Sequence, residues 1–347
     1  MKNHLYRYIG IVCLIALALT LSIANYAFAE ETQTVIDMAG REIVLPKAIE
    51  RVSCMSATCE TAIVAMGQAD KLIYSSAFGS GDFSFTNKLF PDLVDVPKET
   101  TSLSNEALLE QNVDVVFVKS MSNVERLERG GINVVYLEFN NIEQTKCSIQ
   151  LIGQIFDVPE IANEYIGYIE KFLPIINERL HTIPDNEKIR VYVPLLRSNS
   201  DTILNTYDPS HITTELFDLC GAYVITQDIS FTDNNGILTE EALIAQDPDV
   251  IFLCGFYREK GYELLKNGQY DGILSAVDNN KIYYFPLGMY DWSAGGFELG
   301  IAGLWCAKVL YPDLFADIDI YQITKEYYFN TTGTLLTDDD IAYVFHE

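Results

Sequence analysis

Residues 104–117 read SNEALLEQNVDVVF, and residues 239–252 read TEEALIAQDPDVIF. Both segments place Ser or Thr, then Glu-Ala-Leu, then Gln, then Asp-Val-Val/Ile-Phe at matching positions. Ser104 and Thr239 are each expected to cap a helix, which then turns into a β-branched apolar strand of the kind buried in a parallel sheet. The two copies lie 135 residues apart. That spacing is too wide for a solenoid repeat, so it predicts two similar α/β domains.

The similarity between the two halves extends upstream of this repeat. Residues 51–54 read RVSC and residues 190–193 read RVYV, and each predicts a strand. Helices are predicted after them over Thr58–Met66 and Thr213–Leu219, each closed by a glycine that can adopt the left-handed conformation. A further strand is predicted over Leu72–Ser75. The fold class expected is therefore α/β, with two Rossmann-like lobes that contain mostly parallel sheets.

One long helix is expected to join the lobes. Between Glu160 and Ile183, apolar residues recur every three or four positions, as on one face of a helix. Twenty-four residues at 1.5 Å each would reach roughly 36 Å, which makes a stiff connection with little room for lobe closure. The predicted organisation is an N-terminal lobe over 30–159, an interlobe helix over 160–184 and a C-terminal lobe with C-terminal helices over 185–347.

The first 29 residues have the pattern of a secretory signal peptide. Lys2 and Arg7 precede an apolar run over 9–23, and Ala27-Phe28-Ala29 offers a small-x-small cleavage site. The run is shorter than the ~20 residues that a spanning helix needs, although an uncleaved anchor stays open as the alternative. We expect an exported protein in the periplasm or on the outer face of the cytoplasmic membrane.

The charge of the exported chain argues against binding to nucleic acid. Removing Lys2 and Arg7 from the 23 basic residues leaves 21, against 49 acidic residues, which gives a net charge of −28. Phosphate backbones and anionic membranes attract clustered Lys and Arg, which this composition does not favour. A basic protein surface is the partner that suits such a charge.

The numbers of cysteines and histidines limit which disulfides and metal sites the chain can form. Six cysteines follow the signal segment, which permits three disulfides, but most lie in apolar segments typical of buried thiols. Their redox state stays open. The exported chain has three histidines, so a site built from several imidazoles is not expected. Phosphate-binding, nucleophile-elbow and zinc-protease motifs do not occur, and we expect no enzyme, no cofactor and no resident metal site.

Several separated motifs, in order, resemble one family along nearly the whole exported chain. They are Thr34–Pro46 (TVIDMAGREIVLP), Arg51–Asp70 (RVSCMSATCETAIVAMGQAD), His211–Gly221 (HITTELFDLCG), Thr239–Leu253 and Pro286–Phe315. The chain resembles the solute-binding proteins of ABC importers for ferric siderophores, haem and cobalamin, the class III type with a rigid interlobe helix. The resemblance implies capture of a metal chelate in an interlobe cleft and delivery to a membrane permease, by a protein that we expect to be a monomer.

The resemblance also implies a docking role for two carboxylates. In this family, one glutamate in the first helix of each lobe projects from the surface and pairs with arginines of the permease. By position, these residues are Glu60 and Glu215. Exposed ion pairs contribute only about 0–1 kcal/mol each, so they would orient the partner more than supply affinity.

Ligand-binding residues are expected where the strands of each sheet end. Ligands of α/β proteins bind beyond the carboxyl ends of the strands. The residues expected there include Ser76, Phe78, Lys119, Met121, Arg197, Tyr257, Arg258, Tyr290 and Trp292. Tyr207 and His211 flank the first helix of the second lobe and are expected beside them. This aromatic set with few charges suits a flat or chelated ligand, and Trp292 is the residue most expected to contact it.

The identity of the ligand stays open at this point. Haem would need an axial ligand, catecholate complexes would need an arginine cluster, and a corrinoid would need aromatic walls. The alternatives to a transport protein are a secreted enzyme or a scavenger on the same two-lobed scaffold, acting on a metal chelate.

Overall fold

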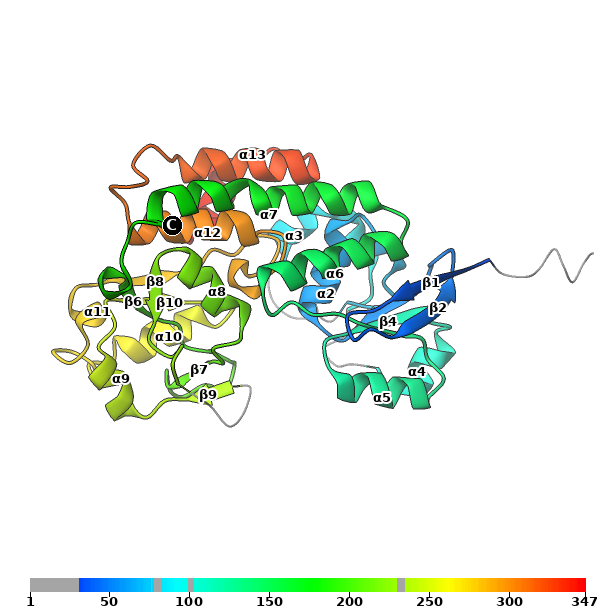
Figure 1. Ribbon diagram of the computed structural model, residues 1–347, viewed down its shortest axis with the longest axis horizontal. Helices are drawn as coiled ribbons and strands as arrows, with labels where there is room; N and C mark the ends of the chain where they lie inside the picture. The colour runs from blue at the N-terminus through cyan, green and yellow to red at the C-terminus, as the bar shows by residue number, and fades with distance from the viewer. Residues whose placement is uncertain (1–30, 76, 78–82, 99–102, 230–234) are drawn as a thin grey trace, which may run out of the picture.

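The computed structural model describes residues 31–75, 77, 83–98, 103–229 and 235–347. The predicted signal segment, Ser76 and Phe78 lie outside these residues. Two α/β lobes lie side by side, and a long helix, α7 (Pro159–Leu180), runs across both of them (Figure 1). The predicted fold class is confirmed.

The N-terminal lobe contains a small parallel sheet and a separate hairpin. The sheet has the order β3-β4-β5, with strands β3 (Val52–Cys54), β4 (Val115–Val118) and β5 (Val134–Tyr136). The antiparallel hairpin consists of β1 (Thr32–Ile36) and β2 (Glu42–Pro46). The helices of this lobe are α2 (Ala57–Ala65), α3 (Ser84–Leu89), α4 (Asn105–Glu110), α5 (Met121–Arg129) and α6 (Ile142–Ile155), with short 3-10 turns η1 (Ala69–Lys71) and η2 (Pro91–Asp95).

The C-terminal lobe repeats this plan with one more parallel strand. Its sheet has the order β11-β10-β6-β8, built from β6 (Ile189–Tyr192), β8 (Ala222–Val224), β10 (Val250–Leu253) and β11 (Ile282–Tyr284). Strands β7 (Asn205–Tyr207) and β9 (Asn235–Ile237) form an antiparallel pair. The remaining elements are η3 (Asp185–Glu187), α8 (Ile212–Leu219), α9 (Glu240–Gln246), α10 (Arg258–Leu265), α11 (Ser275–Asp278), η4 (Trp292–Ala294), α12 (Leu299–Leu310), α13 (Ile320–Thr332) and α14 (Asp338–Phe345).

The repeated sequence motif forms the same unit in both lobes. The hydroxyl of Ser104 accepts from the amide of Ala107, and that of Thr239 accepts from the amide of Ala242, so both predicted helix caps are confirmed. The strands that follow, β4 and β10, are buried at all four positions and lie inside their sheets. The predicted strand over Leu72–Ser75 is wrong. That segment meets its neighbours only through single bridges, at Leu72 and at Ser75.

The backbones of α7 and α12 approach each other closely. An added Cβ at Gly300 of α12 would lie 2.5 Å from the carbonyl oxygen of Ile169 and 2.8 Å from that of Tyr168, both in α7. Only glycine leaves room for this approach. The two helices therefore pack as a pair that spans both lobes.

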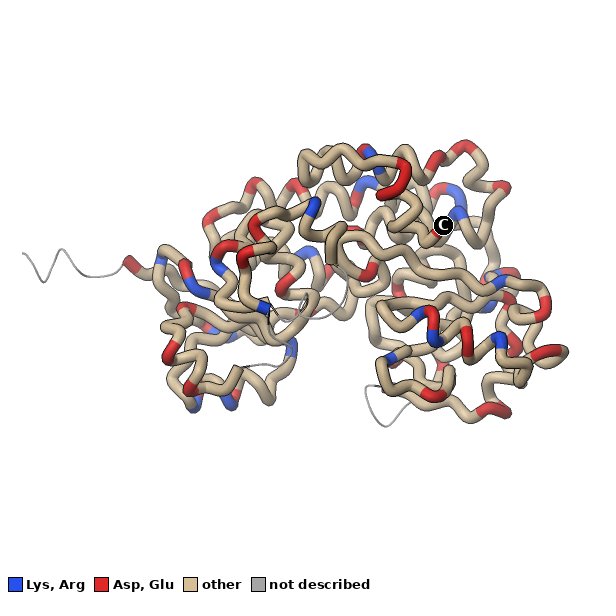
Figure 2. Tube along the Cα trace, turned by 180° about the vertical axis from the view of Figure 1, so that it is seen from behind, with Lys and Arg blue, Asp and Glu red and all other residues tan. Residues whose placement is uncertain are grey.

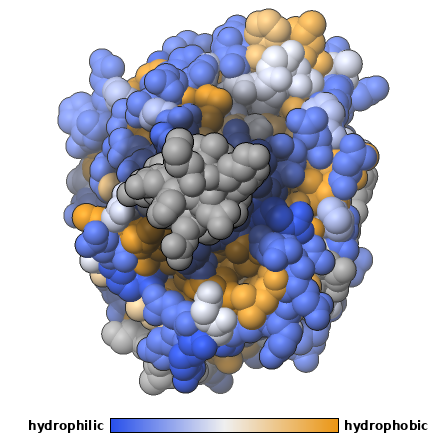
Figure 3. Space-filling model, turned by 90° about the vertical axis from the view of Figure 1, so that its right-hand side faces the viewer, coloured by the Kyte–Doolittle hydropathy of each residue, from blue (hydrophilic) through white to orange (hydrophobic). Residues whose placement is uncertain are grey.

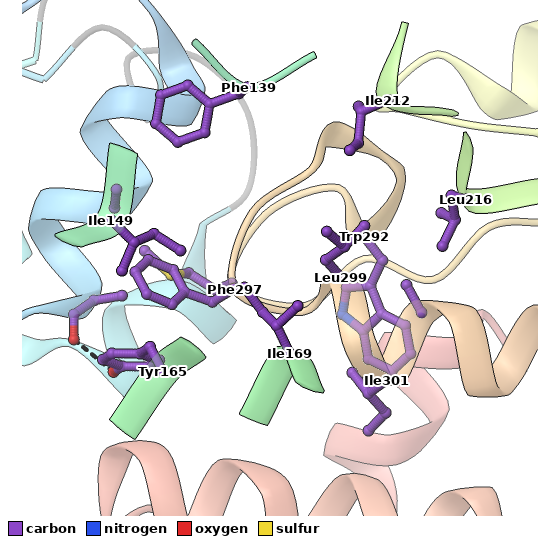
Figure 4. Packing of buried hydrophobic residues seen from close by; sticks show 14 of the residues in the cluster. Phe139, Ile149, Tyr165, Ile169, Ile212, Leu216, Trp292, Phe297, Leu299 and Ile301 are labelled. Atoms are coloured by element: carbon purple, nitrogen blue, oxygen red, sulfur yellow. Dashed lines mark hydrogen bonds between the residues drawn. The ribbon is translucent and has the colours of Figure 1, made fainter. Parts of the chain in front are cut away.

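One hydrophobic core extends from one lobe into the other, although the sequence suggested more than one core. The hydrophobic cluster that contains β3 and α2 also contains α7, α8 and α12, while two smaller clusters lie apart from it, one in each lobe. Figure 4 shows Tyr165 of α7 next to Phe297, which precedes α12, with ring centroids 4.1 Å apart. The Tyr165 hydroxyl donates to the carbonyl of Ala65 in α2. The lobes share this central layer because α7 and α12 are apolar toward both of them.

The six described cysteines are free thiols, and five of them are buried. Among the described residues, no helix combines the length and apolar character needed to cross a bilayer. Acidic residues are spread along the chain of both lobes (Figure 2). The end of the molecule at the N-terminal lobe is mainly hydrophilic, with apolar patches between (Figure 3).

We expect Gly300→Ala to lower the free energy of unfolding by about 1–3 kcal/mol, because two backbone carbonyls of α7 cannot move away from the new methyl group. Gly167→Ala is the matched control, because Gly167 lies on α7 with no atom within 4 Å of its added Cβ. That change should leave stability unchanged or raise it by about 0.5–1 kcal/mol. Urea unfolding followed by circular dichroism measures both. Equal stability of the two variants would show that the close approach of the helices does not matter.

Candidate functional site

Three side chains with polar hydrogens, drawn from both lobes, gather between the carboxyl ends of the two sheets. Lys119 follows β4 directly, Tyr207 is the last residue of β7, and His211 caps α8. We call Lys119, Tyr207 and His211 the donor cluster. The rings of Tyr207 and His211 are stacked, with centroids 4.6 Å apart. The charge of Lys119 reaches His211 across the lobes and helps to lower the pKa of that imidazole.

His211 is neutral and its tautomer follows from its role as a helix cap. Its Nδ1 accepts from the backbone amide of Thr213 at 3.3 Å and lies 2.8 Å from the hydroxyl of the same residue. Because a backbone amide can only donate, Nδ1 carries no proton, and the neutral ring must carry its proton on Nε2. Burial, and then the nearby Lys119, lower the pKa of His211 to about 4. At neutral pH the ring therefore offers one N–H donor, which has no hydrogen-bond acceptor in the described part of the chain.

Lys119 is a half-buried cation without an anionic partner among the described residues. Its Nζ lies 5.5 Å from the centroid of the Phe139 ring and makes neither a hydrogen bond nor an ion pair there. Burial lowers the pKa of this ammonium, although the neighbouring thiol of Cys59 opposes the shift. An ammonium in such a position is costly unless a ligand supplies a negative charge.

Tyr207 supplies the third donor. Burial raises the pKa of its phenol well above the usual value, so the hydroxyl keeps its proton. That hydroxyl has no hydrogen-bond partner among the described residues. The charge of Arg197, an exposed residue that the sequence also predicted for this site, acts on the same phenol.

Aromatic side chains from the two lobes meet beside the donor cluster. Phe83 of the N-terminal lobe and Phe256 of the C-terminal lobe contact each other edge to face, with centroids 5.6 Å apart. Phe256 in turn contacts Tyr290 at 5.2 Å. Sequence reasoning missed both phenylalanines. Phe256 could have been found, because it follows β10 next to Tyr257, whereas Phe83 lies far from any predicted strand end.

Two predicted ligand residues are buried inside the C-terminal lobe, and those predictions are wrong. Trp292 has no exposed surface, and its indole points toward Ile301 (Figure 4). Its Nε1 donates to the hydroxyl of Tyr328 at 3.2 Å. Arg258 is 6% exposed, and its guanidinium donates to the carbonyl of Phe285 at 2.7 Å. Both side chains turn into the lobe because polar partners in the core satisfy them.

The other predicted residues lie at the surface or on the margin of the site. Met121 and Tyr257 are each 43% exposed, at the starts of α5 and α10. Tyr290 is half-buried, and the charge of Glu60 in the opposite lobe adds to burial and to Asp291 in raising the pKa of its phenol. Tyr290 therefore faces the N-terminal lobe.

The loop that carries Tyr290 is fixed by a buried carboxyl group. Oε1 of Glu298 accepts from the amide of Met289 at 2.7 Å and from the hydroxyl of Tyr328 at 2.9 Å. Burial raises the pKa of Glu298 to about 7, although these hydrogen bonds oppose the shift. From the other lobe, Thr86 of α3 donates to the carbonyl of Met289 at 2.8 Å. The residue before Tyr290 is thus tied to both lobes.

The two predicted docking glutamates have different surroundings. Glu60 is 1% exposed, and its carboxylate accepts from the hydroxyl of Ser75 and from the amide of Ala77. The prediction that Glu60 projects from the surface is wrong, because eight of the nine residues of α2 are buried and leave it no outer face. Glu215 is exposed, and its Oε2 accepts from the amide of Ile142 at 2.7 Å. Ile142 is the first residue of α6, which belongs to the other lobe.

One other hollow of the surface contains lysines, but both of them are paired. A hollow of about 540 Å³ beside β2 is lined by Lys47 and Lys71, and each pairs with a glutamate, Glu31 and Glu50. No group of three or more His, Cys, Asp or Glu side chains within the described ranges is placed to hold a metal ion. The donor cluster is therefore the candidate site for a ligand.

We expect the stability of the protein to depend on pH through Glu298. Its folded-state pKa of about 7 lies above the usual 4.5, so the contribution is full below pH 4.5 and is lost as the pH rises through 7. Glu298→Gln should remove up to roughly 3 kcal/mol of this dependence, since one pKa unit corresponds to 1.36 kcal/mol. Unfolding in urea between pH 4.5 and 8 measures it, with Glu326→Gln, exposed on α13, as the control. If the free energy of unfolding changes with pH equally in Glu298→Gln and in the unaltered protein, the expectation is contradicted.

Three solved structures illustrate the fold that this chain shares. A periplasmic solute-binding protein from Veillonella parvula superposes with a TM-score of 0.73 at 22% identity, over 91% of this chain and 97% of that one. The molybdate-bound MolA of Haemophilus influenzae gives 0.75 at 20% identity, over 88% and 99%. Helicobacter pylori CeuE, in a complex with Ni and His, gives 0.73 at 18% identity, over 90% and 98%.

The sequence comparisons agree with the fold. The molybdate-binding protein MolA of Haemophilus influenzae is 24% identical over 259 residues, which cover 73% of this chain and 70% of MolA. The family model for periplasmic binding proteins matches residues 87–287, from α3 in the N-terminal lobe to the loop after β11 in the C-terminal lobe. The chain belongs to the periplasmic binding protein family.

Proposed function

We propose that this protein captures a metal-containing small molecule between its lobes and delivers it to the permease of an ABC importer. The observation that carries the proposal is the donor cluster. It takes residues from both lobes and leaves three donors without described acceptors, as expected of a site that awaits a ligand. The family and the two-lobed fold support the transport role.

We place the protein outside the cytoplasmic membrane. The basic, apolar and small-residue pattern of residues 1–29 supports export, as does membership of a periplasmic family. The net negative charge suits a carrier that meets a basic partner surface.

The ligand class includes metal chelates and metal oxyanions. The sequence favours a chelate such as a ferric siderophore, haem or a corrinoid, whereas one relative is named for molybdate and another was solved with Ni and His. These solutes share a metal centre, and that common feature is what we propose for this protein.

We expect the purified protein to bind one ligand per chain and to release it unchanged. Titration calorimetry with sodium molybdate, cyanocobalamin, haem and ferric enterobactin measures the stoichiometry, and mass spectrometry of the released ligand checks its integrity. Chemical conversion of the ligand would support an enzyme on this scaffold. Binding without any stimulation of an importer would support a scavenger.

Importer stimulation should depend on Glu215 more than on other exposed glutamates. We expect Glu215→Arg to abolish most of the ligand-dependent ATPase activity of the cognate importer in liposomes, because it reverses an exposed charge on the lobe surface. Glu215→Gln keeps an oxygen for the amide of Ile142 and should have a smaller effect.

The matched control is Glu241→Arg, which reverses a second exposed first-turn glutamate in the same lobe. Ligand affinity should stay the same in Glu215→Gln and Glu241→Arg. If Glu215→Arg and Glu241→Arg reduce stimulation equally, net charge matters and Glu215 has no specific docking role.

A further inference from the structure

We propose that the ligand is a compact oxyanion, held through its oxygen atoms by Lys119, Tyr207 and His211, and that no protein side chain binds its metal. This inference rests on the proposed function and names the chemical class of solute for the same site.

Each free polar group of the donor cluster can donate a hydrogen bond, and the ammonium of Lys119 can only donate. Lys119 offers the three hydrogens of an ammonium, and Tyr207 offers a protonated phenol. The carboxylates whose charges act on this region already accept hydrogen bonds. Asp208, whose charge acts on His211, accepts from the amide and the hydroxyl of Ser210. Glu60 accepts from Ser75 and Ala77, and Asp291 accepts from the amide and the hydroxyl of Ser293. A set of donors beside one cation is complementary to an anion that presents several acceptor oxygens.

The tautomer of His211 argues against direct ligation of a metal. A metal binds an imidazole through a nitrogen without a proton. In His211 the unprotonated nitrogen is Nδ1, and the cap of α8 already uses it. Nε2 carries the proton, and the charge of Lys119, which acts on this imidazole, would also repel a metal cation. His211 is therefore a third donor toward an oxygen.

The aromatic contact across the lobes limits the size of the ligand. Phe83 and Phe256 already touch, and Phe256 touches Tyr290. A haem or corrinoid between the lobes would have to separate these rings. The pairing of α7 with α12 resists lobe movement, because their backbones are in contact at Gly300. A tetrahedral oxyanion is much smaller than either of these ring systems.

The test is titration calorimetry of the purified protein, produced by export of the full chain. The probes are sodium molybdate, sodium tungstate, sodium sulfate, sodium phosphate, nickel chloride, haem and cyanocobalamin. We expect one-to-one binding of molybdate or tungstate, and none of nickel ions, haem or cyanocobalamin. A second outcome is that sulfate or phosphate binds more tightly than molybdate and depends on the donor cluster in the same way. That result would support an oxyanion as the ligand, and it would overturn the part of the proposed function that says the ligand contains a metal.

Three substitutions remove one donor each. Lys119→Met, Tyr207→Phe and His211→Asn should each weaken oxyanion binding by about tenfold or more, because a hydrogen bond to a charged group is lost. Asn is a favourable helix cap, so His211→Asn removes the Nε2 donor while an acceptor for Thr213 remains. The melting temperature reports whether each variant folds.

Matched controls remove the same groups elsewhere. Lys281→Met removes an exposed charge at the amino end of β11, the edge of the sheet opposite to the site, and Tyr223→Phe removes an exposed hydroxyl that donates to Asp228. Neither should change the affinity.

Two results would overturn the inference while leaving the proposed function in place. One is tight binding of cyanocobalamin or haem that the three substitutions do not affect. The other is tight binding of nickel ions that His211→Asn abolishes and Lys119→Met strengthens. Failure of every metal-containing probe to bind would overturn the proposed function itself.

Discussion

The contact between the backbones of α7 and α12 determines how the rest of the molecule can behave. Gly300 brings α12 against the carbonyls of Ile169 and Tyr168, and α7 extends from there across both lobes. Packed interiors transmit displacement because they have little free volume. We therefore expect the two sheets to be held at a nearly fixed separation. A site shared between lobes is then largely preformed, which reduces the ordering that a ligand must impose on binding.

The fold could be predicted from sequence where the signals are local. The caps at Ser104 and Thr239, the buried strands β4 and β10, and the apolar face of α7 each follow from spacing within a few residues. The segment Leu72–Ser75 has the composition of a strand, yet it finds partners only at single positions. The continuous core is likewise invisible to local patterns. It depends on which faces of α7 and α12 meet, and the glycine that permits their approach has no periodic signature.

The candidate site was predictable in position more than in orientation. Lys119 follows β4, at the carboxyl end of a parallel strand, as the strand-end rule predicts. Tyr207 instead ends β7, which belongs to an antiparallel pair. That either residue contacts a ligand stays a prediction. The same rule says nothing about where a side chain turns. Trp292 and Arg258 find partners in the core, at Tyr328 and at the Phe285 carbonyl, and so leave the site. In the sequence, Glu60 looks like an ordinary glutamate of a first helical turn. In the structure, α2 is covered on all sides, and the carboxylate of Glu60 accepts hydrogen bonds from Ser75 and Ala77.

The electrostatics of the site explain why an acidic protein would keep a lone lysine there. The chain carries a net charge of −26, so long-range attraction between the protein and an anion is weak or unfavourable. Affinity must come from short-range contacts in a place where water is partly excluded. Lys119 is costly in that place without a partner, as its lowered pKa shows, and an anion that binds removes the cost. The same balance favours selectivity, because a neutral ligand would leave the ammonium of Lys119 unpaired.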